Sequence, residues 1–223
     1  MEIPVLNMQG KQVGTLNVDE QALGGEVNAA LIKQAYVRYH ANRRQGSART
    51  KNRAKVEGST RKLYKQKHTG NARAGAARTN TRRGGGRAFG KFKPREDFRL
   101  DMPIKMRRKA NRNALLAKLI DNEVKIIDGF SMKEPKTHEF QALLGSFGVN
   151  GSCLVAINRE NTNIRLSARN CDRVAVCDAA QLTCFEMLNS RFLVISKADL
   201  EAWLTGPSSV TNKAAKQDRK EAA

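Results

Sequence analysis

A strongly basic segment, residues 43–95, most constrains what this chain can fold into. In 53 residues it holds 18 Lys and Arg, 8 Gly and a single acid, Glu57. Its large apolar side chains are only Val56, Leu63, Tyr64, Phe89 and Phe92. A segment with so little to bury cannot offset the conformational entropy lost on folding. We therefore expect it to be disordered by itself and to be ordered by a partner.

The positive charge of the chain is concentrated in this segment. It carries a net charge of +17 (18 cations less one anion), whereas the whole chain carries +20. The remaining 170 residues are nearly balanced, with 23 cations and 20 anions. Such a concentration predicts a polyanionic partner, either a nucleic acid or an anionic membrane. The membrane is disfavoured because no apolar run of about 18 residues is present. Residues 1–10 also lack the pattern of a secretory signal, so we expect the chain to stay where it is made.

Two amphipathic helices are predicted, one on each side of the basic segment. A short hairpin within residues 3–18 comes first. A helix then follows Gly25, with an apolar face formed by Val27, Leu31, Ala35 and Tyr39. A second helix begins near Pro103 and has a late apolar face formed by Leu115, Leu116, Leu119 and Ile120. Its first turns are basic, which opposes the helix dipole and indicates an external anion nearby.

From residue 123 onward, apolar runs alternate regularly with helical segments. Strands are predicted at residues 124–128, 153–158, 173–178 and 192–196, and helices at 137–147, 161–170, 182–188 and 197–204. We expect an α/β fold, Rossmann-like, with a parallel sheet, helices packed on it and a long extended basic loop inserted between helices. The predicted divisions are an N-terminal part of the α/β domain (1–42), the loop (43–100), the rest of the domain (101–206) and a flexible tail (207–223).

The sequence offers no catalytic, cofactor or metal site, and we expect no enzyme. The glycine run 84–86 with Gly90 is not preceded by a strand and lacks the spacing of a phosphate loop. None of the three histidines stands at metal-ligand spacing from another His or Cys. Asp128 and Asp178 end predicted strands, but no nucleophile or cofactor loop lies near them. We interpret both as loop or cap residues.

Four cysteines are present without a C-x-x-C pair: Cys153, Cys171, Cys177 and Cys184. We interpret them as buried free thiols in a reducing compartment. The alternative is a disulfide or a metal site.

The composition of the basic segment fits RNA. Lys or Arg at every two or three positions matches the density of backbone phosphates, and Gly and other small residues let the chain thread narrow crevices. Tyr64, Phe89 and Phe92 offer rings that can stack on unpaired bases. One alternative is a solvated linker. Another is an α/β nucleic-acid enzyme or nucleotide binder with a basic substrate arm, which needs a nucleotide or a metal at the strand ends after Ile127, Asn158 or Val176.

A set of short motifs runs in order through the basic segment: Arg44-Gln45-Gly46-Ser47 with Thr50-Lys51, then Gln66-Lys67-x-Thr69-Gly70-x-Ala72-Arg73, then Arg83-Gly84-Gly85-Gly86 with Phe89-Gly90. Together with the stretch PIKMRRKANRNALL at residues 103–116, this set resembles the bacterial-type ribosomal protein L-four family of the large subunit. The α/β remainder is also similar, so the resemblance covers most of the chain.

The resemblance implies a structural constituent of the large ribosomal subunit in the cytoplasm, without a cofactor and away from membranes. It implies binding to 23S rRNA early in assembly of the 50S subunit. It also implies that the loop reaches the polypeptide exit tunnel and forms part of its wall beside ribosomal protein L-twenty-two, facing the nascent chain. Some family members repress their own operon by binding its messenger leader, and the resemblance extends to that activity.

The charge pattern and the resemblance together assign rRNA contacts to two arms of the loop and to the start of the following helix: Arg43, Arg44, Arg49, Lys51, Arg53, Lys55, Arg61, Lys62, Lys65, Arg73, Arg78, Arg82, Arg83, Gly84, Gly85, Gly86, Arg87, Phe89, Lys91, Lys93, Arg95, Lys105, Arg107 and Arg108. The family's tip motif falls on residues 62–73 and implies tunnel-lining roles for Tyr64, Gln66, Lys67, His68 and Thr69. This chain departs from the family there, since Tyr64 replaces a usual Trp, Leu63 a usual Pro and His68 a usual Gly. Arg82 likewise replaces an aromatic residue.

Overall fold

The computed structural model describes residues 1–92, 95–206 and 208. The chain separates into two units, Met1–Tyr39 with Asp101–Ala223 and His40–Leu100. The predicted rRNA contact Lys93 and all of the predicted tail except Ser208 lie outside the described residues. No helix among the residues described is long and apolar enough to cross a membrane.

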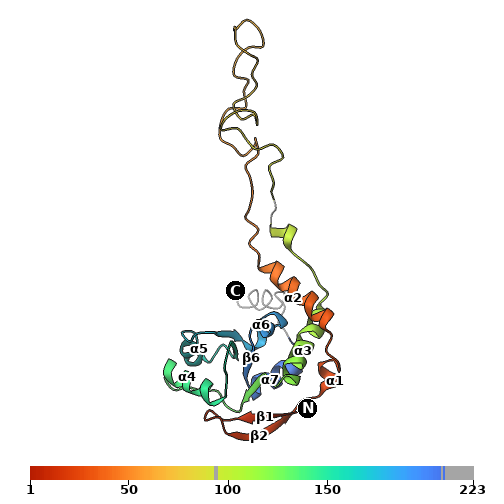
Figure 1. Cartoon of the computed structure of the whole chain (residues 1–223), viewed down its shortest axis with the longest axis vertical. Coiled ribbons are helices and arrows are strands. Elements are labelled where there is room, and N and C mark those ends of the chain that lie inside the picture. Colours follow the sequence, from red (N-terminus) through yellow and green to blue (C-terminus); the bar gives the residue numbers. More distant parts are fainter. Residues whose placement is uncertain (93–94, 207, 209–223) are drawn as a thin grey trace, which may run out of the picture. The chain divides into compact units, whose positions relative to one another are not determined.

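The first unit is built on a six-stranded sheet with the order β2-β1-β3-β6-β4-β5 (Figure 1). The strands are β1 (Glu2–Leu6), β2 (Gln12–Asn17), β3 (Val124–Ile127), β4 (Cys153–Ile157), β5 (Val174–Asp178) and β6 (Phe192–Ser196). The α/β class is therefore confirmed, but the sheet is mixed, because β2 pairs antiparallel with β1 at one edge. The predicted hairpin joins the parallel strands through β1, whose Val5 pairs with Ile126 of β3.

Helices cover both faces of this sheet because the central strands are apolar on both sides. The helices of this unit are α1 (Glu20–Leu23), α2 (Ala29–Arg43), α3 (Ile104–Ile120), α4 (Thr137–Ser146), α5 (Thr162–Ala168), α6 (Cys184–Asn189) and α7 (Lys197–Thr205), with a 3-10 turn η2 (Ala179–Gln181). Leu154 and Ala156 of β4 pack in one cluster with residues of α3, α6 and α7. Val155 and Ile157 point the other way and pack with residues of α4 and α5.

Helix α3 contains eight buried residues, and two of them, both asparagines, connect it to distant segments. Asn113 accepts from the backbone N–H of Asn28 at 2.6 Å, just before α2 begins. Asn111 accepts from the backbone N–H of Cys184 at 2.9 Å and donates to the carbonyl of Ser208 at 3.0 Å. Both amide side chains thus satisfy backbone groups that would otherwise lie unpaired at helix ends or in the chain's last described residue.

Three details of the first unit differ from the predictions. Val27 precedes α2 and is 43% exposed, because Asn28 accepts from the N–H of Leu31 and begins the helix after it. The short helix α1 was not predicted; Asp19 caps it by accepting from Gln21 N–H at 2.9 Å. Ile120 is 51% exposed at the end of α3, whereas Leu115 and Leu116 are fully buried.

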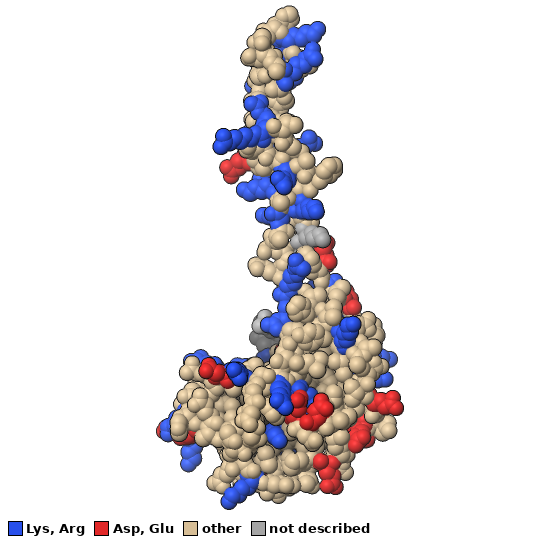
Figure 2. All heavy atoms as spheres, in the orientation of Figure 1, with Lys and Arg blue, Asp and Glu red and all other residues tan. Residues whose placement is uncertain are grey.

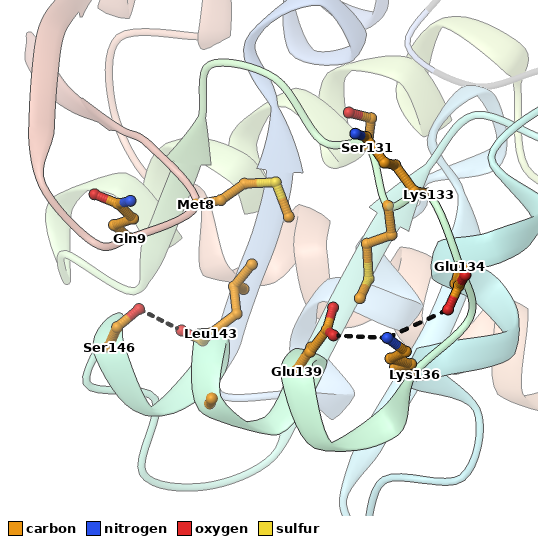
Figure 3. Close-up of a pocket in the computed structure, with 11 residues that line it drawn as sticks. Met8, Gln9, Ser131, Lys133, Glu134, Lys136, Glu139, Leu143 and Ser146 are labelled. Carbon is orange, nitrogen blue, oxygen red and sulfur yellow. Dashed lines mark hydrogen bonds and ion pairs between the residues drawn. The ribbon is translucent and has the colours of Figure 1, made fainter.

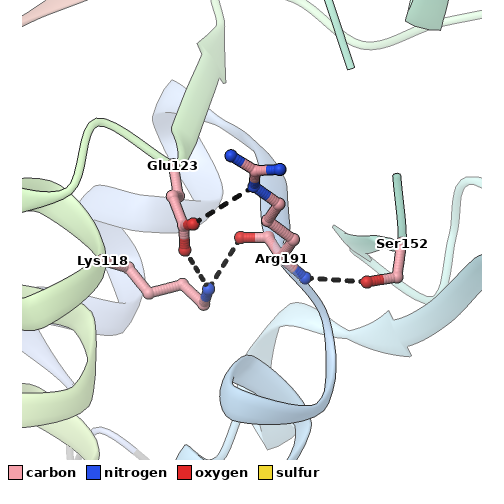
Figure 4. A network of polar contacts seen from close by, with 4 residues as sticks. All are labelled: Lys118, Glu123, Ser152 and Arg191. Carbon is pink, nitrogen blue, oxygen red and sulfur yellow. Dashed lines mark hydrogen bonds and ion pairs between the residues drawn. The ribbon is translucent and has the colours of Figure 1, made fainter. Parts of the chain in front are cut away.

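A network of charged and polar groups joins the amino ends of three adjacent strands (Figure 4). The Lys118 ammonium, on a side chain only 7% exposed, donates to Glu123 Oε2 and to the Arg191 carbonyl, each at 2.7 Å. Arg191 Nε lies 3.6 Å from Glu123 Oε1, and Arg191 N–H donates to Ser152 Oγ at 2.9 Å. Glu123, Ser152 and Arg191 directly precede β3, β4 and β6, so the network fixes the alignment of these strands.

We predict that Glu123→Gln lowers the free energy of unfolding by about 3 kcal/mol, because it leaves the buried Lys118 ammonium without its counter-charge. The double variant Lys118→Met with Glu123→Gln removes that charge and should recover most of the loss. Urea unfolding of the full chain measures both. Equal midpoints for the single and double variants would contradict the role given to the buried ammonium.

Candidate nucleic-acid interface

The second unit, His40–Leu100, is a loop with two antiparallel limbs and almost no regular secondary structure among its described residues. Apart from the end of α2, its one helical element is the 3-10 turn η1 (Arg95–Phe98). Isolated bridges pair Arg49 with Phe92 and Lys62 with Ala76. Between them, Thr50 N–H donates to the Lys91 carbonyl and Arg87 N–H to the Lys51 carbonyl, both at 2.9 Å. The limbs are therefore held by single backbone contacts rather than by a continuous ladder.

Two glycines of the loop make backbone contacts that a side chain would prevent, Gly86 with the opposite limb and Gly85 within its own limb. A Cβ on Gly86 would lie 2.2 Å from the backbone nitrogen of Arg53 on the opposite limb. A Cβ on Gly85 would lie 1.9 Å from the carbonyl oxygen of Thr79. Neither separation is possible for real atoms. The glycine run is thus a site of backbone packing within the loop, which is a role the sequence did not distinguish from phosphate contact.

The predicted tip, residues 62–72, contains a turn formed by His68 and Gly70. Both have left-handed backbones, with φ values of 65° and 68°. His68 therefore keeps the conformation that the usual glycine of the family motif favours, at some cost in backbone strain. The Tyr64 hydroxyl donates to the Ala72 carbonyl, and the Lys62 ammonium donates to Gln66 Oε1. Lys67, His68 and Thr69 remain exposed.

The predicted rRNA-binding cations of the loop lie on its surface (Figure 2). Those described are exposed except Arg78, which is half-buried and donates through Nε to the Gly58 carbonyl; the side chain of Arg95 is outside what the structure describes. Two cations cover rings, since Arg44 lies 3.9 Å from the ring centre of Phe98 and Lys55 lies 4.4 Å from that of Phe92.

Among the described residues, no carboxylate oxygen lies within 4.0 Å of the side-chain nitrogens of the loop cations from Arg49 to Lys91. Glu57 is the one acid in that interval. Cations held close together without anions repel one another, and an external polyanion removes that repulsion.

A second basic site lies on α3 in the first unit. Lys105 and Arg108 line a cavity of about 560 Å³ together with Lys109 and Arg112, beside Gly24 and Gly206. The sequence prediction missed Lys109 and Arg112, although the spacing of the four cations along one helix face was the signal for them. Arg112 is the last of these four cations along α3. Its Nε donates to Ser208 Oγ at 2.6 Å, which holds its side chain in place.

Arg107, which was predicted to act with Lys105 and Arg108, is not part of that cavity. It is half-buried and interacts electrostatically with Tyr39 of α2. Burial raises the pKa of Tyr39, and the charges of Arg38 and Arg107 partly offset that effect. Arg107 therefore lies near Tyr39 and apart from the cavity that Lys105 and Arg108 line.

The carboxyl edge of the sheet does not favour the enzyme alternative. A cavity of about 680 Å³ lies there, next to Met8 after β1 and Ser131 after β3 (Figure 3). Three of its charged groups bind one another, since Lys136 Nζ lies 3.2 Å from Glu134 and 3.4 Å from Glu139. These two carboxylates raise the pKa of Lys136, so it stays charged and is no nucleophile.

The other groups singled out as chemical candidates have structural roles. Asp178 caps η2 by accepting from Ala180 N–H at 3.3 Å and pairs with Arg159, which confirms its interpretation as a cap. The four cysteines are free, and all but the half-buried Cys177 are buried. Burial raises the pKa of Cys153, Cys177 and Cys184 to about 12. These three thiols are therefore protonated at neutral pH and are poor nucleophiles and metal ligands.

Comparison with known proteins shows similarity across both units. The model of the "Ribosomal protein L4/L1 family" matches residues 16–204. The "Large ribosomal subunit protein uL4" of Dehalococcoides mccartyi strain BAV1 is 45% identical over 197 residues, which cover 88% of this chain and 93% of the relative. The protein of the same name from Symbiobacterium thermophilum is 40% identical over 196 residues, covering 88% and 94%. That from Desulfatibacillum aliphaticivorans is 37% identical over 201 residues, covering 90% and 96%.

We predict that Gly86→Ala separates the two limbs, because the added methyl group cannot fit against the Arg53 backbone. Amide hydrogen exchange at Arg87 and Thr50, whose N–H groups donate across the limbs, should become faster by about tenfold or more. Gly75→Ala is the matched control, since its Cβ would lie 3.6 Å from Thr79 Cγ2, an ordinary contact. Unchanged exchange in Gly86→Ala would show that the limbs are not held at this point in solution.

Proposed function

Because the chain belongs to the ribosomal protein L4/L1 family, we propose that it is a structural constituent of the large ribosomal subunit whose basic loop binds 23S rRNA. Members of this family are structural proteins rather than enzymes, and this chain is one of them. The observation that carries the proposal is the set of exposed loop cations, from Arg49 to Lys91, without carboxylate partners among the described residues.

Phosphate is the group that this loop is suited to bind. Each cation that neutralises a backbone phosphate releases condensed counterions, and this release supplies much of the affinity. The contact of Gly86 with the Arg53 backbone holds the two limbs close together, so the loop is narrow and both of its limbs carry cations. A narrow loop with cations on both limbs fits between RNA helices, where a folded domain would be excluded by its size.

The cations of α3 extend the proposed interface to the first unit. Lys105, Arg108, Lys109 and Arg112 line one cavity, and the first turn of α3 has no side-chain cap hydrogen bond at Pro103. Free N–H groups at a helix start favour an anion. We include Lys109 and Arg112 in the proposed rRNA contacts and leave Arg107 out.

We further propose that the tip of the loop forms part of the wall of the polypeptide exit tunnel, beside ribosomal protein L-twenty-two. The exposed Lys67, His68 and Thr69 at the left-handed turn support this role for those three residues. Tyr64 is hydrogen-bonded to Ala72 and Gln66 to Lys62, so we give these two residues the role of stabilising the turn. In this arrangement Lys67 faces the nascent chain.

The proposal includes early binding to 23S rRNA during assembly of the 50S subunit and repression of the chain's own operon through its messenger leader. Both rest on the family resemblance. The physical support is that the loop's contacts are directed at phosphate, which rRNA and messenger RNA share. Competition between the two RNAs for one chain would test the second role.

We predict that the affinity of the full chain for 23S rRNA falls steeply with salt. Arg73→Ala removes one exposed cation of the second limb, so it should weaken binding several-fold and lower the slope of log K against log [KCl] by about one. Lys133→Ala removes an exposed cation of the first unit outside α3 and should leave the slope unchanged. A weak salt dependence of the unaltered chain would contradict phosphate binding by the loop.

We predict that Lys67→Glu in assembled large subunits changes sensitivity to antibiotics that bind in the exit tunnel, because it reverses a charge at the proposed wall. Lys67→Arg keeps the charge and serves as the control. Incorporation into subunits is measured in parallel. Normal incorporation with an unchanged drug response would show that Lys67 does not face the tunnel.

A further inference from the structure

The four aromatic rings of the loop differ in the contacts that they make within the protein. Lys55 lies over the ring of Phe92, and Arg44 lies over the ring of Phe98. Tyr64 is half-buried, with its hydroxyl bonded to the Ala72 carbonyl. Phe89 is 100% exposed, so nothing in the described part of the chain covers its ring.

The protein holds Phe89 in this exposed position. On its two sides, Arg87 and Lys91 are each bonded to the opposite limb, through the Lys51 carbonyl and the Thr50 N–H at 2.9 Å. Residues 88–90 therefore form a short projection between two fixed points. At the end of this projection, Gly90 packs closely against Asn52, since a Cβ on Gly90 would lie 3.0 Å from the Asn52 side chain.

The backbone of Phe89 is also strained. Its φ of 48° lies in the left-handed region, which a bulky residue rarely adopts. An exposed ring on a strained backbone contributes nothing to the stability of the free chain. Strained residues held by their surroundings are concentrated at sites that contact ligands.

We propose that Phe89 is a base-stacking residue, whose ring packs on an unpaired base of the rRNA while neighbouring cations bind the flanking phosphates. This inference rests on the proposed function and adds to it the class of nucleotide that is recognised. Arg87 and Lys91 flank the exposed ring of Phe89 in the sequence, so this short stretch offers a base a ring to stack on and offers its neighbouring phosphates a cation on either side. A base within a duplex is covered by its neighbours, so the partner is a bulged or looped nucleotide.

The test is a titration of the full chain with a 23S rRNA transcript over a range of KCl concentrations. Phe89→Ala and Phe89→Leu should each weaken binding by about ten- to a hundredfold with the salt slope unchanged, because a ring is lost and no phosphate contact. Phe89→Tyr should bind within about threefold of the unaltered chain. Circular dichroism should show the same fold in all variants, since the side chain makes no internal contact.

A spectroscopic variant gives a direct signal. Stacking on a base should quench the fluorescence introduced by Phe89→Trp when the transcript is added. Val13→Trp is the matched control at an exposed position of β2, and its fluorescence should stay unchanged. Equal responses of the two variants would overturn the proposal.

The remaining outcomes separate this inference from the proposed function. If Phe89→Leu binds as tightly as the unaltered chain, the ring face is not used. If Phe89→Ala binds the transcript normally but fails to enter reconstituted subunits, the ring contacts a protein. Either result overturns stacking while Arg73→Ala still weakens binding. If Arg73→Ala and Phe89→Ala both bind normally, rRNA binding by the loop fails as well.

Discussion

Repulsion between like charges is the constraint on which the organisation of this chain depends. The loop holds nearly all of the net charge of the protein and one acid in residues 43–95. Such a segment cannot be folded into a core, since its cations would need buried partners that it does not possess. Apolar burial and positive charge are therefore separated in this chain. The nearly neutral α/β unit buries its apolar residues, whereas the cationic loop buries almost none.

In the α/β unit, several buried polar side chains of α3 bind groups of the same unit. Asn111 and Asn113 of α3 bind backbone groups of distant segments, and Lys118 shares Glu123 with Arg191 at the amino ends of the strands. The loop shows the reverse pattern. The cations from Arg49 to Lys91 have no carboxylate partner among the described residues, and Arg78 and Lys55 contact a carbonyl oxygen and a ring face instead. Their charges stay available to a partner.

Periodicity predicted most of the α/β unit because each strand and helix carries its own local pattern. The pairing of the predicted hairpin with β3 and the burial of Asn111 and Asn113 could not be predicted this way, since both depend on partners far away in the sequence. The same limit applies to the loop. Charge density predicted a polyanion partner, but only the structure separates Arg107, which packs near Tyr39, from Lys105 and Arg108, which line a basic cavity.

The strand order has a consequence for synthesis. Strand β6 lies between β3 and β4, although it is the last strand to be made. Until Phe192–Ser196 has left the ribosome, β3 and β4 have no common neighbour and both present unpaired edges. The loop, by contrast, is complete about a hundred residues earlier. A newly made chain therefore completes its cationic segment while β3 and β4 still have unpaired edges, which are the parts of an unfinished sheet that are prone to aggregate.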